Sequence, residues 1–328
     1  ILMAPYRHDP PEVPPIFAWH HGASLRALGR TFAHDAFGKL PWARSAGVPV
    51  TTPGPRFHQV VPARADELLN EYVGWSGARL AEYKSTVPPH LFFQWSFPAM
   101  QEVCNVLPLP LTRMLNQGCK MRIRHPIPRG AELHVTACLR EVIEEEGRVK
   151  ITVAIETGSA AHPDAIAAEL YLTIPRRTKK AERGNPHSGD RTSRPNVNLP
   201  AVPGSASAIA VHNLSRRCGL DCAYITGDFN PIHCSVAVAR ASGFSSTILQ
   251  GFGQFGLVFE DLVRAECGGD PKLLRMLDVR FVGSVLLPRE IHVSIDSAAR
   301  QVMEGDEPGG RAALLGTYEV DRGPMSKL

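Results

Sequence analysis

The sequence predicts an α+β protein of two similar halves, each with one long helix lying on an antiparallel sheet. Three observations predict this fold class. The chain has 328 residues, enough for about two domains of roughly 150 residues. An apolar helix pattern followed by strand-like runs occurs twice, in residues 57–176 and 208–328. The segment Ile127-Pro-Arg-Gly-Ala-Glu-Leu-His-Val135 also resembles Leu287-Pro-Arg-Glu-Ile-His-Val293, which favours an internal duplication.

The composition is that of a folded, soluble chain. Apolar residues make up 44% and charged residues 21% of the sequence. The net charge of +4 is small and does not indicate a nucleic-acid partner. No run of about 18 apolar residues occurs, so no membrane span is expected. Seven cysteines are too few for a disulfide scaffold and their number is odd, which favours a reducing compartment.

Residues 1–56 are rich in proline, histidine and small residues and are predicted to form an N-terminal arm. Within it, residues 24–39 fit one basic amphipathic helix, which is either a segment packed on the main body or the remnant of a targeting sequence. The first half follows at 57–176. Its predicted helices cover 64–75 and 97–107, and its predicted strands cover 119–125, 132–142, 149–158 and 165–174.

A linker is predicted at 177–207, where a basic run is followed by closely spaced glycines and prolines. The basic run fits solvated surface or, alternatively, a contact for an acidic ligand. The second half covers 208–328. A helix or turn is predicted at 216–225 and helices at 235–241 and 251–266, and the predicted strands cover 277–281, 290–296 and 311–320. In the long helix, Phe252, Phe255, Phe259 and Leu262 recur at helical spacing and are expected to face the sheet.

The most informative segment is the turn Tyr224-Ile-Thr-Gly-Asp-Phe-Asn-Pro-Ile-His233. The proline disfavours helical backbone at Asn230, so Asp228 and His233 lie on a tight turn that can aim a carboxylate and an imidazole into one space. Such a pair suits general acid–base chemistry, and Asn230 can bond the backbone within the turn. Two other interpretations stay open. One is a capped turn in which His233 is merely buried, and the other is a metal site that adds Cys234, although the cysteines lack CxxC spacing.

A second segment, Ile248-Leu-Gln-Gly-Phe-Gly-Gln254, opens the long helix of the second half at Gly251. The start of a helix carries free backbone N–H groups and the positive end of the helix dipole, which can hold a developing oxyanion. The same glycines also fit close packing of the helix on the sheet. The sequence leaves both interpretations open.

Together these residues resemble the MaoC-like, or hydratase 2, family of (R)-specific enoyl-CoA hydratases and 3-hydroxyacyl-thioester dehydratases. The likeness rests on Gly227-Asp-Phe-Asn-Pro-Ile-His233, on Ala241-Ser-Gly-Phe244 and on Ile248-Leu-Gln-Gly-Phe252. It is strong over 215–295 and moderate over 57–175. The resemblance implies a double hot-dog fold in which the C-terminal half carries the catalytic motif. The matching turn of the first half, Tyr72-Val-Gly-Trp-Ser-Gly77, lacks that motif, so one active site per chain is expected.

The resemblance also assigns roles. It implies that Asp228 and His233 are the catalytic pair, that Asn230 stabilises the turn and that the Gly251 N–H binds the thioester oxygen. The implied substrate is a trans-2-enoyl thioester of CoA or of an acyl carrier protein, hydrated to a 3-hydroxyacyl thioester without a metal or redox cofactor. Many members have histidine where this chain has Gln250. Because the proposed donor is a backbone N–H, this departure need not abolish activity.

Further residues are candidates for binding the substrate. Phe92, Phe93, Trp95 and Phe97 either line an acyl tunnel, as the resemblance suggests, or belong to the core. Arg240 and Arg264 are candidates for contacting the CoA phosphates.

The alternative function is a catalytically silent hot-dog subunit or assembly factor of a larger complex. The presence of all four motif residues favours the enzyme. The sequence is compatible with a monomer and with a homodimer. The last three residues, Ser326-Lys-Leu328, match a eukaryotic peroxisomal address, whereas a bacterial protein is expected in the cytoplasm.

Overall fold

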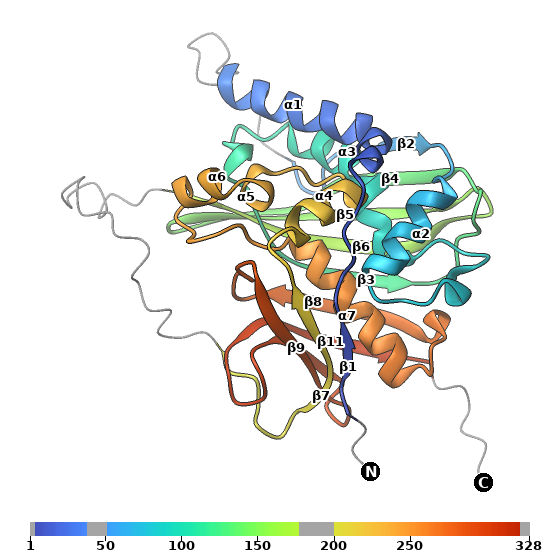
Figure 1. Ribbon diagram of the computed structural model, residues 1–328. Helices are drawn as coiled ribbons and strands as arrows, with labels where there is room; N and C mark the ends of the chain where they lie inside the picture. Colours follow the sequence, from blue (N-terminus) through green and yellow to red (C-terminus); the bar gives the residue numbers. More distant parts are fainter. Residues whose placement is uncertain (1–3, 38–50, 177–199, 322–328) are drawn as a thin grey trace, which may run out of the picture.

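Strands from both halves of the chain join into one sheet. The computed structural model describes residues 4–37, 51–176 and 200–321, so the predicted address at 326–328 and most of the linker lie outside it. Eleven strands of the described residues hydrogen-bond in the order β1-β7-β9-β10-β11-β8-β3-β6-β5-β4-β2 (Figure 1). This arrangement, with helices packed on an almost wholly antiparallel sheet, confirms the predicted α+β class.

The two halves contribute equivalent sets of elements. The first half contains β2 (Phe57–Val61), α2 (Asp66–Trp75), η3 (Leu80–Tyr83), η4 (Pro89–Leu91), α3 (Phe92–Cys104), η5 (Leu111–Arg113), β3 (Leu115–Ile123), β4 (Leu133–Glu145), β5 (Arg148–Ser159) and β6 (His162–Pro175). The second contains β7 (Ser207–Leu214), α4 (Cys218–Thr226), α5 (Pro231–Cys234), α6 (Val236–Ala241), α7 (Gly251–Glu266), η6 (Pro271–Leu273), β8 (Leu274–Phe281), β9 (Arg289–Asp296), β10 (Gln301–Gly305) and β11 (Ala312–Val320).

The strand order supports the internal duplication. The first half runs β3-β6-β5-β4-β2 across the sheet, and the second runs β8-β11-β10-β9-β7. The strands of the two halves correspond in chain order: β2 to β7, β3 to β8, β4 to β9, β5 to β10 and β6 to β11. The similar segments noted in the sequence lead into the equivalent strands β4 and β9. The two halves therefore share one topology.

The halves meet where β3 pairs antiparallel with β8, from Gly118 opposite Arg280 to Arg122 opposite Met276. Gly118 has a φ of +148°, and a Cβ there would lie 2.1 Å from the Val279 carbonyl oxygen. Only glycine fits that approach without moving the backbone. The junction thus depends on a residue without a side chain.

One continuous hydrophobic core runs through both halves. The expectation for the long helix of the second half is confirmed, because Phe252, Phe255, Phe259 and Leu262 of α7 are all buried in that core. The halves are therefore packed as one body and not as two separately folded domains.

The N-terminal arm is built into this body. Its described residues form β1 (Tyr6–His8), η1 (Pro15–His21) and α1 (Gly22–Phe37). Strand β1 pairs parallel with β7 at one edge of the sheet, and α1 lies across the first half (Figure 1). The structure favours the packing interpretation of this segment.

Some predicted boundaries were wrong. The helix expected at 97–107 is α3, which begins at Phe92 and contains Pro98, because the buried aromatic residues before the proline extend it. Residues 200–206, expected as linker, pack against the second half: Val202 is buried beside Met303 and its N–H donates to the Gly310 carbonyl oxygen at 2.9 Å. Strands β1, β2, β7 and β10 had not been predicted; three of them have five residues or fewer, too few to show a pattern.

No helix in the described ranges combines the length and apolar character that a membrane crossing requires.

A buried carboxyl group on β10 is expected to make the stability of the fold depend on pH. Glu304 is fully buried, and within the described part of the chain neither carboxyl oxygen has a hydrogen-bond partner. Burial, and then the negative charge of Asp261, raises its pKa to about 8. The folded state therefore keeps a proton that the unfolded state releases, and the free energy of unfolding falls as pH rises from about 4.5 to about 8.

Glu304→Gln removes this titration while keeping the shape of the side chain. We expect the melting temperature of the variant, relative to wild type, to be several degrees higher at about pH 8 than at about pH 5. Scanning calorimetry at the two pH values measures this difference. Glu307→Gln, on the exposed loop after β10, is the matched control. A constant difference between Glu304→Gln and wild type across the pH range would contradict the prediction.

Candidate active site

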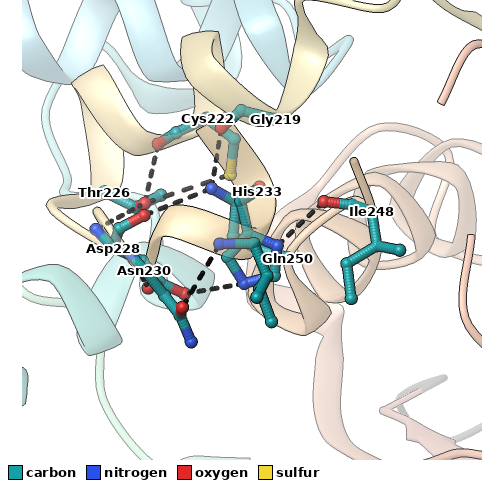
Figure 2. A network of polar contacts seen from close by, with 9 residues as sticks. Gly219, Cys222, Thr226, Asp228, Asn230, His233, Ile248 and Gln250 are labelled. Atoms are coloured by element: carbon teal, nitrogen blue, oxygen red, sulfur yellow. Dashed lines mark hydrogen bonds and ion pairs between the residues drawn. The ribbon is translucent and has the colours of Figure 1, made fainter. Parts of the chain in front are cut away.

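The predicted turn begins where α4 ends. Gly227 adopts the left-handed conformation (φ +80°) that commonly terminates helices, and its N–H donates to the Ala223 carbonyl oxygen. The Thr226 hydroxyl donates to the Cys222 carbonyl oxygen at 2.7 Å and accepts from the Asp228 N–H at 3.4 Å (Figure 2). The chain therefore leaves α4 abruptly, and Asp228 follows directly after the cap.

Asn230 shapes the rest of the turn. Its side-chain oxygen accepts from the Ile232 N–H at 3.4 Å and caps α5, whose first residue is Pro231. Its own N–H donates to Oδ1 of Asp228 at 3.3 Å. This places Asn230 where it stabilises the turn, as the sequence analysis expected. Oδ2 of Asp228 is left facing His233.

The imidazole of His233 is held in one orientation. Its Nδ1 lies 2.8 Å from the Ile248 carbonyl oxygen (Figure 2). A carbonyl oxygen only accepts, so Nδ1 carries the proton, and in the neutral ring Nε2 is the free acceptor. That nitrogen lies 3.9 Å from Oδ2 of Asp228. His233 can therefore act as a base toward the side of the turn where Asp228 stands.

The separation of the pair leaves room for a shared water. At 3.9 Å the two atoms are too far apart for a direct hydrogen bond, and a water about 2.8 Å from each fits between them. The His233 side chain is 9% exposed and that of Asp228 is 22% exposed, so the pair is reachable from a cavity but sheltered from bulk water. This is the geometry that activation of one water by two groups needs.

The start of α7 faces the same cavity. Residues 247–249 pair with 285–287 across the chain, which fixes the entry to the helix. Gly251 is the first residue of α7, where the N–H has no acceptor within the helix. A Cβ at Gly251 would lie 2.6 Å from the Phe281 ring, which also lines the cavity. The cavity has a volume of about 380 Å³, and all four predicted site residues, Asp228, Asn230, His233 and Gly251, line it.

The metal interpretation gains no support from the described residues. No three histidine, cysteine, aspartate or glutamate side chains come together there in a way that could hold a metal ion. Burial, and then the negative charge of Asp228, raises the pKa of the Cys234 thiol to about 11. Cys234 is therefore a thiol at neutral pH, whereas zinc is bound by thiolate.

Gln250 acts behind the turn. It is buried, and its Nε2 donates to the Gly219 carbonyl oxygen at 2.7 Å and to the Asp228 carbonyl oxygen at 3.3 Å (Figure 2). The amide thus ties the backbone of Asp228 to α4 and to the residue before α7. This is a positioning contact made by the residue in which the chain departs from the motif of the family.

Gln250→Ala removes both hydrogen bonds. We expect kcat of the reaction proposed below to fall about tenfold or more, with a smaller change in KM, because Asp228 loses a constraint on its position. Gln250→His keeps a ring N–H donor and is expected to recover part of the loss. Steady-state kinetics on the three proteins, with melting temperatures as the check on folding, measure this. Equal kcat values for wild type and Gln250→Ala would rule out the positioning role.

The structure divides the aromatic candidates. Phe93 and Phe97, one helical turn apart on α3, line the cavity, whereas Phe92 and Trp95 do not. Phe92 is part of the core, and the Trp95 indole N–H donates to the Thr157 hydroxyl at 3.0 Å. Each of the two sequence interpretations therefore holds for one face of the helix.

The two arginines differ as well. Arg264 lies near the C-terminal end of α7, about 20 Å along the helix from Gly251. Its guanidinium pairs with Asp261 at 2.8 Å, donates to the Gly77 carbonyl oxygen and covers the Tyr6 ring, and its candidacy as a phosphate contact stays a prediction. Arg240 is exposed on α6 and stays a prediction.

The equivalent place in the first half is filled by buried groups. It lies between α2 and the start of α3, where the Tyr83 hydroxyl donates to Oε1 of Glu260 at 2.5 Å and Nε2 of His90 lies 3.3 Å from the same oxygen. Burial lowers the pKa of His90 to about 3 and raises that of Glu260 to about 8. The three residues are fully buried, and the expectation of one site per chain stays a prediction.

Comparisons with known proteins agree with this fold and match the segment that contains the turn with Asp228 and His233. The MaoC like domain model matches residues 221–309. Enoyl-CoA hydratase 2, peroxisomal, of Arabidopsis thaliana is 31% identical over 61 residues, which are 19% of this chain and only 20% of that protein. HtdX of Mycobacterium tuberculosis superposes with a TM-score of 0.63 at 17% identity, covering 81% of this chain and 100% of that one. Another Mycobacterium tuberculosis protein, described as having a double hotdog fold, superposes with a TM-score of 0.52 at 12% identity, covering 82% and 96%.

Fold and site together define a double hot-dog protein with one cavity-lining Asp–His turn, in its C-terminal half. Residues 221–309 of that half match the MaoC like domain, which confirms the MaoC-like resemblance of the motif over these residues.

The sequence analysis missed some residues of the site. Leu28, Thr31 and Phe32 of α1 line the cavity, although the arm had been assigned no part in the site. The buried face of α1 consists of Ser24, Ala27 and Thr31, and these small and polar side chains gave no sign that the predicted helix borders a cavity. Thr226 and Gly227 could have been recognised, because a glycine after a helical run marks a helix end.

Proposed function

We propose that this protein hydrates trans-2-enoyl-CoA to (R)-3-hydroxyacyl-CoA and catalyses the reverse dehydration, in fatty acid metabolism. One observation carries the proposal: Asp228 and His233, with 3.9 Å between Oδ2 and Nε2, face the same cavity as the N–H of Gly251 at the start of α7. A water activator and an oxyanion donor thus share one space. The MaoC-like domain and the name of the Arabidopsis relative support the same class of reaction.

In this proposal the thioester carbonyl oxygen accepts from the Gly251 N–H, which withdraws electrons from C3. The water held by Asp228 and His233 attacks C3 and breaks the C2=C3 π bond. The pair takes one proton from this water and returns one to C2, so the addition is balanced. A backbone donor of this kind contributes about 3 kcal/mol to stabilising the enolate.

The cavity supports an acyl substrate. From the catalytic turn it extends along Phe93, Phe97 and Met100 of α3, which are apolar and buried. Its volume of about 380 Å³ lies within the range of small-molecule sites. In this arrangement the thioester lies at the start of α7 and the alkyl chain lies against α3.

The experiment is hydration of crotonyl-CoA and of a medium-chain trans-2-enoyl-CoA by the purified protein, with the product identified by an (R)-3-hydroxyacyl-specific dehydrogenase. Turnover to the (R) product supports the proposal, and the (S) product contradicts it. Turnover only on acyl-carrier-protein thioesters would transfer the proposal to that carrier. Failure on both would favour the catalytically silent subunit.

The setting of this reaction is part of the proposal. The Arabidopsis relative is named as a peroxisomal enzyme, which supports a role for this chain in peroxisomal fatty acid metabolism. Imaging of a fluorescent fusion against a peroxisomal marker tests it.

A further inference from the structure

The N-terminal arm contributes a wall of the catalytic cavity. Leu28, Thr31 and Phe32 of α1 line the same space as Asp228 and His233. Phe32 is 48% exposed and Thr31 is 2% exposed, so α1 covers the cavity at the boundary between protein and solvent. Neither half of the double hot dog supplies this wall.

At its N-terminal end, α1 is fixed to the catalytic turn through His21. The Nε2 of His21 donates to the Tyr224 carbonyl oxygen at 2.7 Å, and its Nδ1 lies 3.1 Å from the Gln94 side-chain amide nitrogen. Burial lowers the pKa of His21 to about 4, so the ring is neutral and fits one donor and one acceptor role. A Cβ at Gly227 would lie 2.8 Å from the same ring. The arm therefore packs directly beneath the turn that carries Asp228.

At its C-terminal end, α1 is fixed to the first half. The Asp35 carboxylate accepts from the Leu111 N–H at 2.9 Å and from the Thr112 N–H at 2.7 Å. Arg30 forms an ion pair with Glu102 of α3. Because both ends are held, the position of the middle turn, with Leu28 and Thr31, is defined relative to the cavity.

The faces of α1 differ in a way that suits a wall. Its buried face is formed by Ser24, Ala27 and Thr31, and the Thr31 hydroxyl donates to the Ala27 carbonyl oxygen at 3.2 Å. Small side chains let α1 approach α3 closely. Leu28 lies at the edge of this face, beside the cavity, whereas Leu25 is 44% exposed and does not line it.

The same cavity is lined by Phe93, Phe97 and Met100 of α3 and by Leu111 and Met114. Leu28 lies seven residues beyond His21, which meets the catalytic turn, so it stands about 10 Å further along the helix. An alkyl chain that starts at the turn therefore reaches Leu28 only when it is long enough. The residues on α1 therefore act on long chains and not on short ones.

We propose that α1 sets the acyl-chain length accepted by the site, with Leu28, Thr31 and Phe32 as specificity-determining residues. This inference rests on the proposed acyl-thioester function for its ligand class, and it adds the residues that select within that class.

The test is calorimetric binding of the saturated thioesters butyryl-CoA and dodecanoyl-CoA, which cannot be hydrated. For Leu28→Trp we expect the affinity for dodecanoyl-CoA to fall at least about tenfold while that for butyryl-CoA stays within about twofold, since the larger side chain displaces buried CH₂ groups. Leu28→Ala is a smaller change that disturbs folding less. It is expected to change the affinity for dodecanoyl-CoA and to leave the affinity for butyryl-CoA unchanged. Leu25→Trp, on the exposed face of the same helix, is the matched control and is expected to shift neither.

The outcomes separate this inference from the proposed function. If folded Leu28 variants change the affinities for both chain lengths equally, or change neither, the inference is overturned even where wild type hydrates enoyl-CoA. If wild type binds the thioesters but hydrates none, and the Leu28 variants change the affinity for dodecanoyl-CoA alone, then α1 is supported as the length determinant and only the proposed reaction is ruled out. No binding of either thioester by wild type overturns the inference.

Discussion

Replacing Asp228 with asparagine is expected to lower kcat for enoyl-CoA hydration about a thousandfold, within the range for loss of a general acid–base group. The amide oxygen can still accept from the Asn230 N–H, which lies 3.3 Å from Oδ1, so the turn keeps its shape. What is lost is the carboxylate charge that faces Nε2 of His233. Steady-state hydration of crotonyl-CoA measures the change.

Asp164→Asn is the control, because this side chain on β6 is 47% exposed, does not line the cavity and forms an ion pair with the exposed Arg124. It is expected to retain wild-type kcat. Melting temperatures of the two variants show that folding is intact. If Asp228→Asn keeps more than about a tenth of the wild-type kcat, Asp228 is not the catalytic carboxylate.

The second large effect is expected from Gly219→Ala on α4. A Cβ at this position would lie 2.4 Å from the carbonyl oxygen of His233, a backbone atom that cannot move without moving the catalytic turn. Gly219 also accepts the Gln250 hydrogen bond through its carbonyl oxygen. We expect kcat to fall about a hundredfold, because misplacing a reacting group by about 1 Å has effects of this size.

Gly74→Ala is the matched control for this substitution. Gly74 lies on α2, which precedes α3 as α4 precedes α7, and a Cβ there would meet nothing within 4 Å. Alanine favours helix more than glycine does, so this variant is expected to keep full activity and to be slightly more stable. Equal activities for Gly219→Ala and Gly74→Ala would mean that the turn tolerates the displacement.

The sequence was most informative where one physical signal dominated. The bounds of α7 were predicted at Gly251 and Glu266 because its apolar residues recur at helical spacing. The turn around Asp228 and His233 was recognisable because glycine, asparagine and proline each restrict the backbone in a known way. The repeated segment before β4 and β9 indicated the duplication that the strand order now supports.

Other features depend on contacts distant in sequence. A helix was predicted to start near Phe97, yet α3 begins at Phe92, and burial of Phe92 and Trp95 extends it in front of Pro98. The role of α1 at the cavity follows from His21 meeting Tyr224 and from Asp35 meeting Leu111, pairs that no local pattern joins. The contacts of Arg264 could not be predicted from a local pattern either, since its hydrogen-bond partner Gly77 lies in the other half.

The most direct test of the central claim is hydration of crotonyl-CoA in D₂O, with the configurations at C2 and C3 of the product read by NMR. In the proposed mechanism Asp228 and His233 hold one water on one side of the cavity, so one water and one pair of groups serve both carbons. We expect hydroxyl and deuterium to add to the same face of the double bond and the product to be (3R). Addition to opposite faces, a (3S) product or no turnover of the thioester would contradict it.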